Sequence, residues 1–280
     1  MSLVRQERVV HYPCSDGKPM AETPEHLDAM IYLITALQAY FAERDDVYVG
    51  GNQFLYWIEG NPRQRVAPDV YVVFGVPKRP PRPTWKVWEE GKAPDVILEL
   101  TSRSTAGEDL DRKYRLYQRL GVKEYILIDV TREYLIEPVL LHRLTGEEYQ
   151  QVPNERPNDR EWRVTSEQLG LQIVVRAEDE GYLIRLWDPV RQQMLPSPQE
   201  VTEEILQLYE QMEEMRQREA EARRRAAEEA RRAQEEARRA EEEARRAEEE
   251  ARRRAELEAR LREMEEELRR LKGDGERTGG

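Results

Sequence analysis

The chain has 280 residues, enough for one or two domains, and 36% of them are charged. Its formal net charge of −12 excludes a broadly basic surface, so that any contact with nucleic acid must come from a local patch. Its single cysteine, Cys14, excludes an intrachain disulfide framework and a cysteine-cluster zinc site.

The beginning of the chain does not combine a basic segment with an apolar one, so a secretory signal is not expected. No apolar run approaches the ~20 residues that are needed to span a bilayer. We therefore expect a protein without membrane segments that resides in a reducing cytoplasm.

The first predicted element is a helix that begins after Thr23. Thr23 suits the N-cap, Pro24 suits the first helical position, and Glu25 complements the positive end of the helix dipole. The apolar residues that follow keep helical spacing and are predicted to face the core: Leu27, Met30, Ile31, Ile34, Leu37 and Phe41.

Three later runs are nearly continuous in apolar residues, which is typical of strands buried on both faces of a sheet. These runs are residues 70–74, 96–100 and 124–129. A helix over residues 109–120, ended by Gly121, is predicted between the second and third runs. Shorter strands with polar turns are expected from Tyr134 to Trp187.

Beyond Pro196 and Pro198 the composition changes to a low-complexity, highly charged segment. It is predicted to form one helix, on the order of 100 Å long. Its alanines recur three and four residues apart, as in a heptad seam, whereas its Glu→Arg pairs also favour a single helix in water. Both a coiled coil and a lone charged helix remain open. We expect a folded domain over 1–195, a linker over 196–201, a helical tail over 202–272 and disorder over 273–280.

Glu99 is the candidate functional residue that the pattern marks most clearly. It lies inside an apolar run, where a carboxylate is costly to bury unless it is paired or binds a cation. Asp95 shares its face of the strand but lies about 13 Å away, too far to share one metal ion. Asp69, at the start of the preceding apolar run, is therefore the favoured partner, although such a residue is often only a turn residue.

Further candidates come from the two predicted helices. Lys113 lies on the helix after the Glu99 strand, where most lysines are solvated surface residues. Glu22 and His26, at the first helix, are candidates to line a cleft at Asp69 and Glu99. The alternative for His26 is an ordinary position in the first turn of this helix. Tyr117 is expected to pack or to orient a neighbour rather than to react.

These motifs resemble the Uma-type family of restriction endonucleases, a branch of the PD-(D/E)xK nuclease superfamily. The resemblance covers roughly residues 10–190, implies an α/β, restriction-endonuclease-like fold in which helices flank a mixed sheet, and implies Asp69 and Glu99 as metal ligands and Lys113 as the amine. It rests on these segments: Ala67-Pro68-Asp69-Val70, Pro94-Asp95-Val96-Ile97-Leu98-Glu99-Leu100-Thr101-Ser102-Arg103-Ser104-Thr105, Asp109, Lys113, Tyr117 and Gly121-Val122-Lys123-Glu124-Tyr125-Ile126-Leu127-Ile128-Asp129.

One position departs from the superfamily pattern, because Thr101 stands where a lysine is expected two residues after the glutamate. The resemblance suggests that Lys113 supplies the amine from the helix instead. It implies a Mg²⁺- or Mn²⁺-dependent nuclease that hydrolyses phosphodiester bonds in DNA. The tail itself predicts a homodimer, because it carries an apolar stripe at each end: Ile205, Leu208, Met212 and Met215, and Leu257, Leu261, Met264, Leu268 and Leu271. The alternative is a catalytically inactive nuclease-fold domain that serves as a binding or scaffold module, which would neither bind the metal nor cleave DNA.

Overall fold

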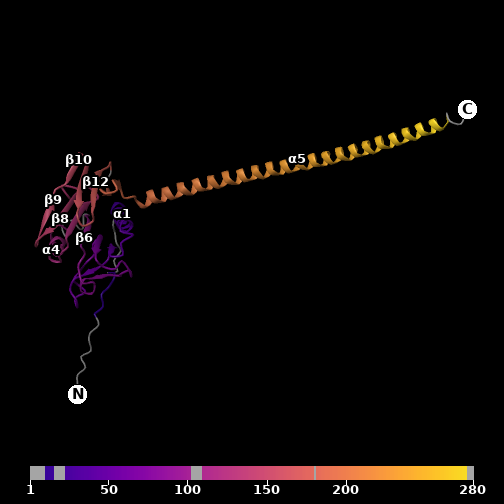
Figure 1. Cartoon of the computed structure of the whole chain (residues 1–280). Coiled ribbons are helices and arrows are strands. Elements are labelled where there is room, and N and C mark those ends of the chain that lie inside the picture. The colour runs from indigo at the N-terminus through magenta and orange to yellow at the C-terminus, as the bar shows by residue number, and fades with distance from the viewer. Residues whose placement is uncertain (1–9, 16–22, 102–108, 180, 276–280) are drawn as a thin grey trace, which may run out of the picture. The chain divides into compact units, whose positions relative to one another are not determined.

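The computed structural model describes residues 10–15, 23–101, 109–179 and 181–275, with the backbone alone for 109–110 and 267–275. Contacts divide the chain into two units, Met1–Glu203 and Glu204–Gly280. The first unit contains the sheets and the short helices, and the second consists of most of one long helix (Figure 1).

A six-stranded mixed sheet forms the centre of the first unit. Its central strands β6 and β7 run parallel, and each of the other neighbouring pairs runs antiparallel. In order across the sheet, the strands are β1 (Val47–Gly50), β4 (Val70–Phe74), β6 (Val96–Thr101), β7 (Glu124–Asp129), β8 (Val139–Thr145) and β9 (Glu148–Val152).

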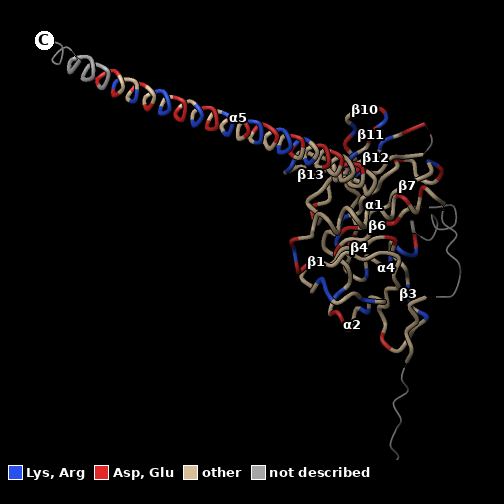
Figure 2. The backbone as a smooth tube through the Cα atoms, turned by 90° about the vertical axis from the view of Figure 1, so that its right-hand side faces the viewer, with Lys and Arg blue, Asp and Glu red and all other residues tan. Residues whose placement is uncertain are grey.

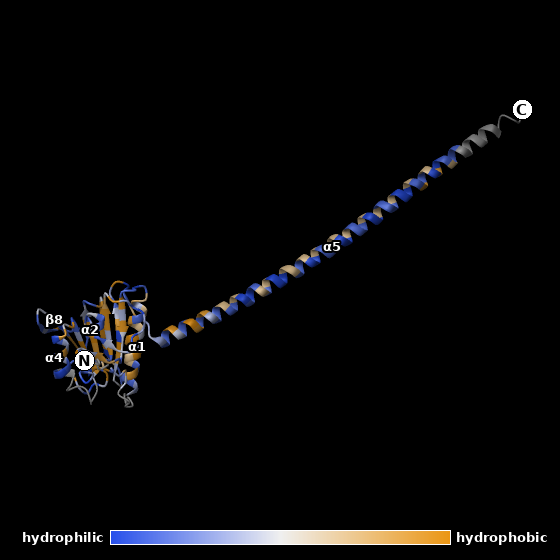
Figure 3. Cartoon of the chain, turned by 90° about the horizontal axis from the view of Figure 1, so that it is seen from below, coloured by the Kyte–Doolittle hydropathy of each residue, from blue (hydrophilic) through white to orange (hydrophobic). Residues whose placement is uncertain are grey.

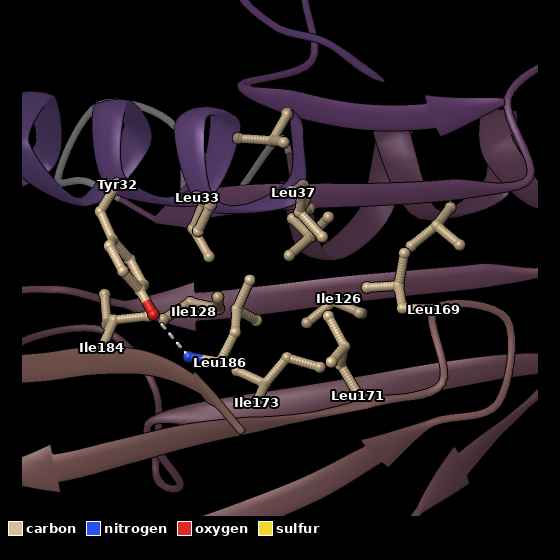
Figure 4. Packing of buried hydrophobic residues seen from close by; sticks show 14 of the residues in the cluster. Tyr32, Leu33, Leu37, Ile126, Ile128, Leu169, Leu171, Ile173, Ile184 and Leu186 are labelled. Carbon is tan, nitrogen blue, oxygen red and sulfur yellow. Dashed lines mark hydrogen bonds between the residues drawn. The ribbon is translucent and has the colours of Figure 1, made fainter. Parts of the chain in front are cut away.

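One face of this sheet packs against helix α1 (Pro24–Tyr40) and a second, antiparallel sheet of five strands. Figure 4 shows this core, in which the Tyr32 hydroxyl accepts a hydrogen bond from the Leu186 amide at 2.8 Å. The same hydroxyl donates a hydrogen bond to the Leu195 carbonyl at 3.1 Å. The second sheet consists of β10 (Glu155–Asn158), β11 (Glu161–Ser166), β12 (Leu171–Ala177), β13 (Tyr182–Asp188) and β14 (Gln193–Met194).

The buried face of α1 differs from the predicted one at two positions. Leu27 and Ile31, which were expected in the core, are 45% and 43% exposed. The buried stripe instead follows His26, Met30, Leu33 and Leu37, which lie three or four residues apart. The stripe is set by what the neighbouring sheets cover, and the sequence contains more apolar residues than this face can bury.

The opposite face of the six-stranded sheet packs against a smaller group of elements. Helix α4 follows directly on a π-helical turn, η1, and its Leu116 and Tyr117 enter the core on this face. The group comprises η1 (Asp109–Lys113), α4 (Tyr114–Arg119), α2 (Val87–Glu90) and a three-stranded sheet of β3 (Arg65–Val66), β2 (Leu55–Tyr56) and β5 (Trp85–Lys86).

The three strands predicted from continuous apolar runs are confirmed as β4, β6 and β7. Every residue of β6 and β7 is buried, and so is every residue of β4 except Phe74, which is half-buried. Burial on both faces explains why these strands show no alternation of apolar and polar residues. The predicted class, a mixed sheet flanked by helices with a long C-terminal helix, is confirmed.

Helix α5 (Pro198–Gly275) begins with a capping box. The Glu200 carboxylate accepts a hydrogen bond from the Ser197 amide at 2.7 Å, and the Ser197 hydroxyl accepts one from the Glu200 amide at 3.2 Å. The bond from the Ser197 amide is the main reason why the pKa of Glu200 lies below its usual value. The helix therefore begins at Pro198, inside the segment 196–201 that was expected to be a linker, and not at Thr202.

Beyond its first turns α5 is a highly charged helix. Figure 2 shows basic and acidic residues alternating along it, and in Figure 3 its ribbon is coloured mostly as hydrophilic. Pairs four residues apart, such as Arg231 with Glu235 at 3.6 Å, support the helix from its own side chains. Among the described residues, no helix is both long and apolar enough to cross a membrane. Helix α5 continues to Gly275, so residues 273–275, which were expected to be disordered, are helical, and the rest of that segment, 276–280, lies outside the described residues.

Candidate active site

Asp69 directly precedes β4, and Glu99 lies in the neighbouring antiparallel strand β6. Val70 of β4 pairs with Leu98 of β6, and this register places Asp69 beside Glu99. The Leu100 amide donates to Asp69 Oδ2 at 2.8 Å, and the Asp69 amide lies 3.4 Å from Glu99 Oε2. The register of β4 and β6 therefore brings both carboxylates to one point of the sheet.

Lys113 reaches the same point from η1. Its Nζ lies 3.1 Å from Glu99 Oε2, and the two side chains are only 11% and 1% exposed. It is thus a buried, paired lysine rather than the solvated one that helical lysines usually are. An ammonium at this distance compensates the charge that makes burial of Glu99 costly.

Tyr117 contacts one oxygen of the Glu99 carboxylate, and His26 lies near one oxygen of the Asp69 carboxylate. The fully buried Tyr117 donates its hydroxyl proton to Glu99 Oε1 at 2.7 Å. His26, buried in the first turn of α1, has Nε2 at 3.5 Å from Asp69 Oδ1. Tyr117 thus has the orienting position expected for it, and His26 lies beside Asp69. Glu22 and the segment 102–105 lie outside the described residues.

Sequence reasoning missed two features of this site. The π-helical turn, a form that often occurs at functional sites, ends at Lys113, but its residues read as an ordinary helix. The backbone after β1 also contacts the site, because the Asn52 amide lies 3.2 Å from the Asp69 carbonyl. Two consecutive glycines, Gly50 and Gly51, were the available signal, since glycine permits such close backbone approach.

Thr101, at the position where the superfamily pattern has lysine, is fully buried. Its hydroxyl donates to the Ile128 carbonyl of the parallel neighbour β7 at 3.3 Å. The side chain therefore ties β6 to β7 and carries no charge, which leaves Lys113 as the amine in contact with Glu99.

Three other buried carboxylates of the central strands have different surroundings. Asp129 accepts hydrogen bonds from the amides of the turn that follows it, and Glu124 accepts from Arg143, Ser166 and backbone amides. Asp95, at the other end of β6, pairs with Lys92 at 2.7 Å and Lys123 at 2.9 Å. These contacts hold loops and strands together.

Asp95 gives a testable stability effect. Burial, the largest influence, raises the pKa of Asp95, but hydrogen bonds from Lys92, the Phe74 amide and Lys123 together bring it below its ordinary value. A depressed folded pKa stabilises the protein above the unfolded pKa, and this stabilisation is lost as the pH falls through the folded pKa. Asp95→Asn should lower the free energy of unfolding at pH 7 by roughly 1–3 kcal/mol, since the Phe74 amide and two ammonium groups lose their anion.

Urea unfolding at pH 7 and in acid measures this effect, with the exposed Asp45 changed to Asn as the matched control. The difference between Asp95→Asn and wild type should shrink as the pH falls, whereas Asp45→Asn should follow wild type throughout. A constant difference at all pH values would show that the lost packing, and not the charge, explains the change.

The donor set at Asp69 and Glu99 suits a hard divalent cation. Carboxylate oxygens are the ligands that Mg²⁺ takes, usually one or two from the protein together with water. Each oxygen has two lone pairs, so the protein donors already present leave capacity for a further partner. Over the described ranges, no three His, Cys, Asp or Glu residues gather as a ready-made metal centre. The site therefore suits a cation that takes two carboxylate ligands from the protein and completes its coordination with water molecules.

Comparisons with known proteins agree with the motifs. The family model Uma2, described as "Putative restriction endonuclease", matches residues 3–176. Among solved structures, a nuclease of the DUF820 group from Anabaena variabilis ATCC 29413, itself described as putative, is 14% identical with a TM-score of 0.38, over 54% of this chain and 76% of that one. No curated protein matches the chain. Because the family model spans well over half of its residues, the chain belongs to the Uma2 family of restriction-endonuclease-like proteins.

Proposed function

We propose that the first unit is a metal-dependent nuclease that hydrolyses phosphodiester bonds in DNA. The observation that carries this proposal is the buried group of Asp69, Glu99 and Lys113, in which the lysine ammonium lies 3.1 Å from one carboxylate. The strand register and the following helix deliver these side chains from separate elements to one point. Membership of a family described as restriction endonucleases supports DNA as the substrate.

Asp69 and Glu99 are the proposed ligands for Mg²⁺ or Mn²⁺, and the carbonyl oxygen of Leu100 is a third candidate. A bound divalent cation supplies compensation for phosphate charge and acidifies a water molecule. The protein's own part is to hold both carboxylates still. Tyr117 fixes Glu99 from one side, and the Leu100 amide fixes Asp69 from the other.

Lys113 is the proposed amine of the reaction. Its positive charge is fixed beside Glu99, where it can orient the attacking water or stabilise the negative charge that develops on the phosphate in the transition state. A charge held in a site with little water acts more strongly than one in bulk solvent. His26, at 3.5 Å from Asp69, is a positioning residue in this scheme.

Assembly belongs to the same proposal: two chains form a homodimer through α5. The helix exposes large apolar side chains near its start, among them Ile205, Leu208 and Met212. Exposed apolar stripes on a charged helix are typical of coiled-coil partners. We also place the protein in the cytoplasm, because its single cysteine suits a reducing compartment.

The proposal is tested with the full chain. Calorimetric titration with Mg²⁺ and Mn²⁺ should show binding, and supercoiled DNA should be cleaved only when the cation is added. Parallel incubation with RNA and with single-stranded DNA defines the substrate class. A chain that binds neither cation and cleaves none of these nucleic acids is the inactive scaffold instead.

Gly51→Ala should impair cleavage although residue 51 bears no chemistry. A Cβ there would lie 2.6 Å from the Asp69 carbonyl oxygen and 2.4 Å from Ile34 Cδ1, closer than real Cβ contacts allow. The backbone at Asp69 must therefore shift, and a misplacement of about 1 Å at an active site costs on the order of 10²-fold in rate. A plasmid-cleavage rate measures the loss.

The matched control is Gly146→Asn in the turn between β8 and β9. Gly146 has φ +64°, a conformation that asparagine tolerates, and an added Cβ would have nothing within 4 Å. It should retain the wild-type rate. Equal rates for Gly51→Ala and wild type would show that the position of the Asp69 backbone does not matter to the reaction.

A further inference from the structure

Two apolar stripes on α5 share one heptad phase, although they lie far apart. Ile205 and Leu261 are separated by 56 residues (261 − 205 = 56), which is a whole number of heptads. With Ile205 at position a, every member of both stripes falls at a or d, and each is 46–62% exposed. The stripes are Ile205, Leu208, Met212 and Met215 near the folded unit, and Leu257, Leu261 and Met264 near the far end.

This common phase has a meaning only for paired helices. A straight α-helix drifts by ~20° per heptad relative to a strict repeat of seven, so over ~8 heptads the stripes would turn ~160° apart. On a lone, straight helix they would face nearly opposite sides. In a left-handed supercoil the drift disappears and both stripes lie on one seam.

The segment between the stripes contributes spacing rather than affinity. Its a positions are mostly alanine and its d positions mostly glutamate, so little apolar area can be buried there. In a parallel pair each of these glutamates faces its own copy, and the arginine three residues later on the same helix compensates the negative charge locally. The alanines are Ala226, Ala233, Ala240 and Ala247, and the glutamates are Glu229, Glu236, Glu243 and Glu250.

The charges beside the far stripe favour one direction of pairing. In a parallel coiled coil a residue at g faces the e residue five positions later on the other helix. In the far stripe this places Arg253 opposite Glu258 of the partner subunit and Arg260 opposite Glu265 of the partner subunit, and two-fold symmetry repeats both pairs. All four side chains are exposed on α5 and can reach across the seam.

An antiparallel pair would lose this match. Bringing the near stripe onto the far stripe of the other chain sets the g positions against each other, so that Arg218 meets Arg260 of the partner subunit and Arg225 meets Arg253 of the partner subunit. The parallel pair has one such repulsive contact, between Arg218 and Arg223 of the partner subunit. Like charges across a seam are destabilising. At the e positions of the antiparallel pair, Arg216 attracts Glu258 of the partner subunit. This one attraction does not outweigh the repulsion between the arginines at the g positions.

We infer that α5 pairs in parallel and in register with α5 of a second copy of this chain, through its two end stripes. This deepens the proposed association and rests on it. Parallel pairing attaches both folded units to the same end of the coiled coil. Two copies of the candidate active site would then be available to one duplex, as cleavage of both of its strands requires.

Cysteine cross-linking of the full chain tests the direction. In a Cys14→Ser background, Met264→Cys places one thiol at a d position, where a parallel dimer brings it opposite its own copy within disulfide reach. It should form at least about tenfold more interchain disulfide in a glutathione buffer than Ala259→Cys, which points outward at position f. An antiparallel dimer would instead give disulfide only after Met212→Cys and Met264→Cys chains are mixed, which would overturn the inference.

A charge exchange tests the register. Arg253→Glu with Arg260→Glu should raise the dimer dissociation constant by about tenfold, because four attractive pairs become repulsive. Adding Glu258→Arg and Glu265→Arg should restore it. Sedimentation equilibrium distinguishes a failure of the association from a failure of the proposed direction of pairing. A monomeric wild-type chain refutes the association itself, whereas a dimer without the Met264→Cys cross-link or without charge rescue refutes parallel pairing alone. Neither readout involves cleavage, so the nuclease proposal stands or falls separately.

Discussion

Asp69→Asn and Glu99→Gln should each abolish divalent-cation binding and reduce DNA cleavage by about 10³-fold or more. Each change removes one of the two anionic ligands, and several kcal/mol of charge stabilisation correspond to this loss of rate. The fold should survive in Asp69→Asn, because an amide oxygen can still accept the hydrogen bond from the Leu100 amide. Calorimetric titration with Mn²⁺ measures the binding, and a plasmid assay measures the rate.

Asp111→Asn is the matched control for both variants. Asp111 lies in η1, close to the site in sequence, but its side chain is mostly exposed and pairs with Arg115 at 2.7 Å. This variant should bind the cation and cleave DNA as wild type does. If Asp69→Asn or Glu99→Gln still binds the cation with unchanged affinity, the proposed ligand is wrong and the chemistry lies elsewhere on the chain.

The sequence predicted the central strands well because their burial is complete. Strands covered on both faces must be apolar throughout, so β4, β6 and β7 appear as uninterrupted runs that few other structures produce. The buried face of α1 was harder to assign. Apolar residues occur on more than one side of this helix. The sheets that pack on it determine that Leu33 is buried while Leu27 is not.

The site could be predicted in part, for a related reason. A carboxylate inside an apolar run was a good marker of burial, but Asp95, Glu124 and Asp129 are buried as well and serve to hold the fold together. What sets Glu99 apart is that Asp69, with a second carboxylate, lies beside it, together with Lys113 of η1 and Tyr117 of α4. Spacing along one strand cannot reveal partners that depend on where a π-helical turn points its last side chain.

The start of α5, unlike the partners of Glu99, is determined by residues that are close in the sequence. The start of α5 depends on two residues three positions apart, Ser197 and Glu200, whose reciprocal hydrogen bonds need no other part of the chain. A search for this Ser-x-x-Glu pattern would have placed the start at Pro198, whereas the change in composition alone placed it at Thr202. The pairing of β2 with β5, in contrast, joins residues about thirty apart, and nothing in either short strand announces it.

Lys113→Met should lower both the cleavage rate and the stability of the first unit. The rate should fall by about 10²–10³-fold, the usual cost of removing one preorganised group that stabilises transition-state charge. The free energy of unfolding should fall by about 3 kcal/mol, because Glu99 is left buried without its counter-charge. Cation binding should remain, since the lysine is not a ligand.

The double variant Lys113→Met with Glu99→Gln separates the two roles of this lysine. A neutral pair of similar volume removes the unpaired buried charge, so most of the lost stability should return while cleavage stays absent. All five tryptophans belong to the first unit, so their fluorescence during urea unfolding reports on this unit without a contribution from tryptophan in α5. Non-additive stabilities in this cycle would establish the buried pair. Wild-type cleavage by Lys113→Met would instead assign Lys113 a purely structural role, that of the cation which lets Glu99 be buried beside Asp69.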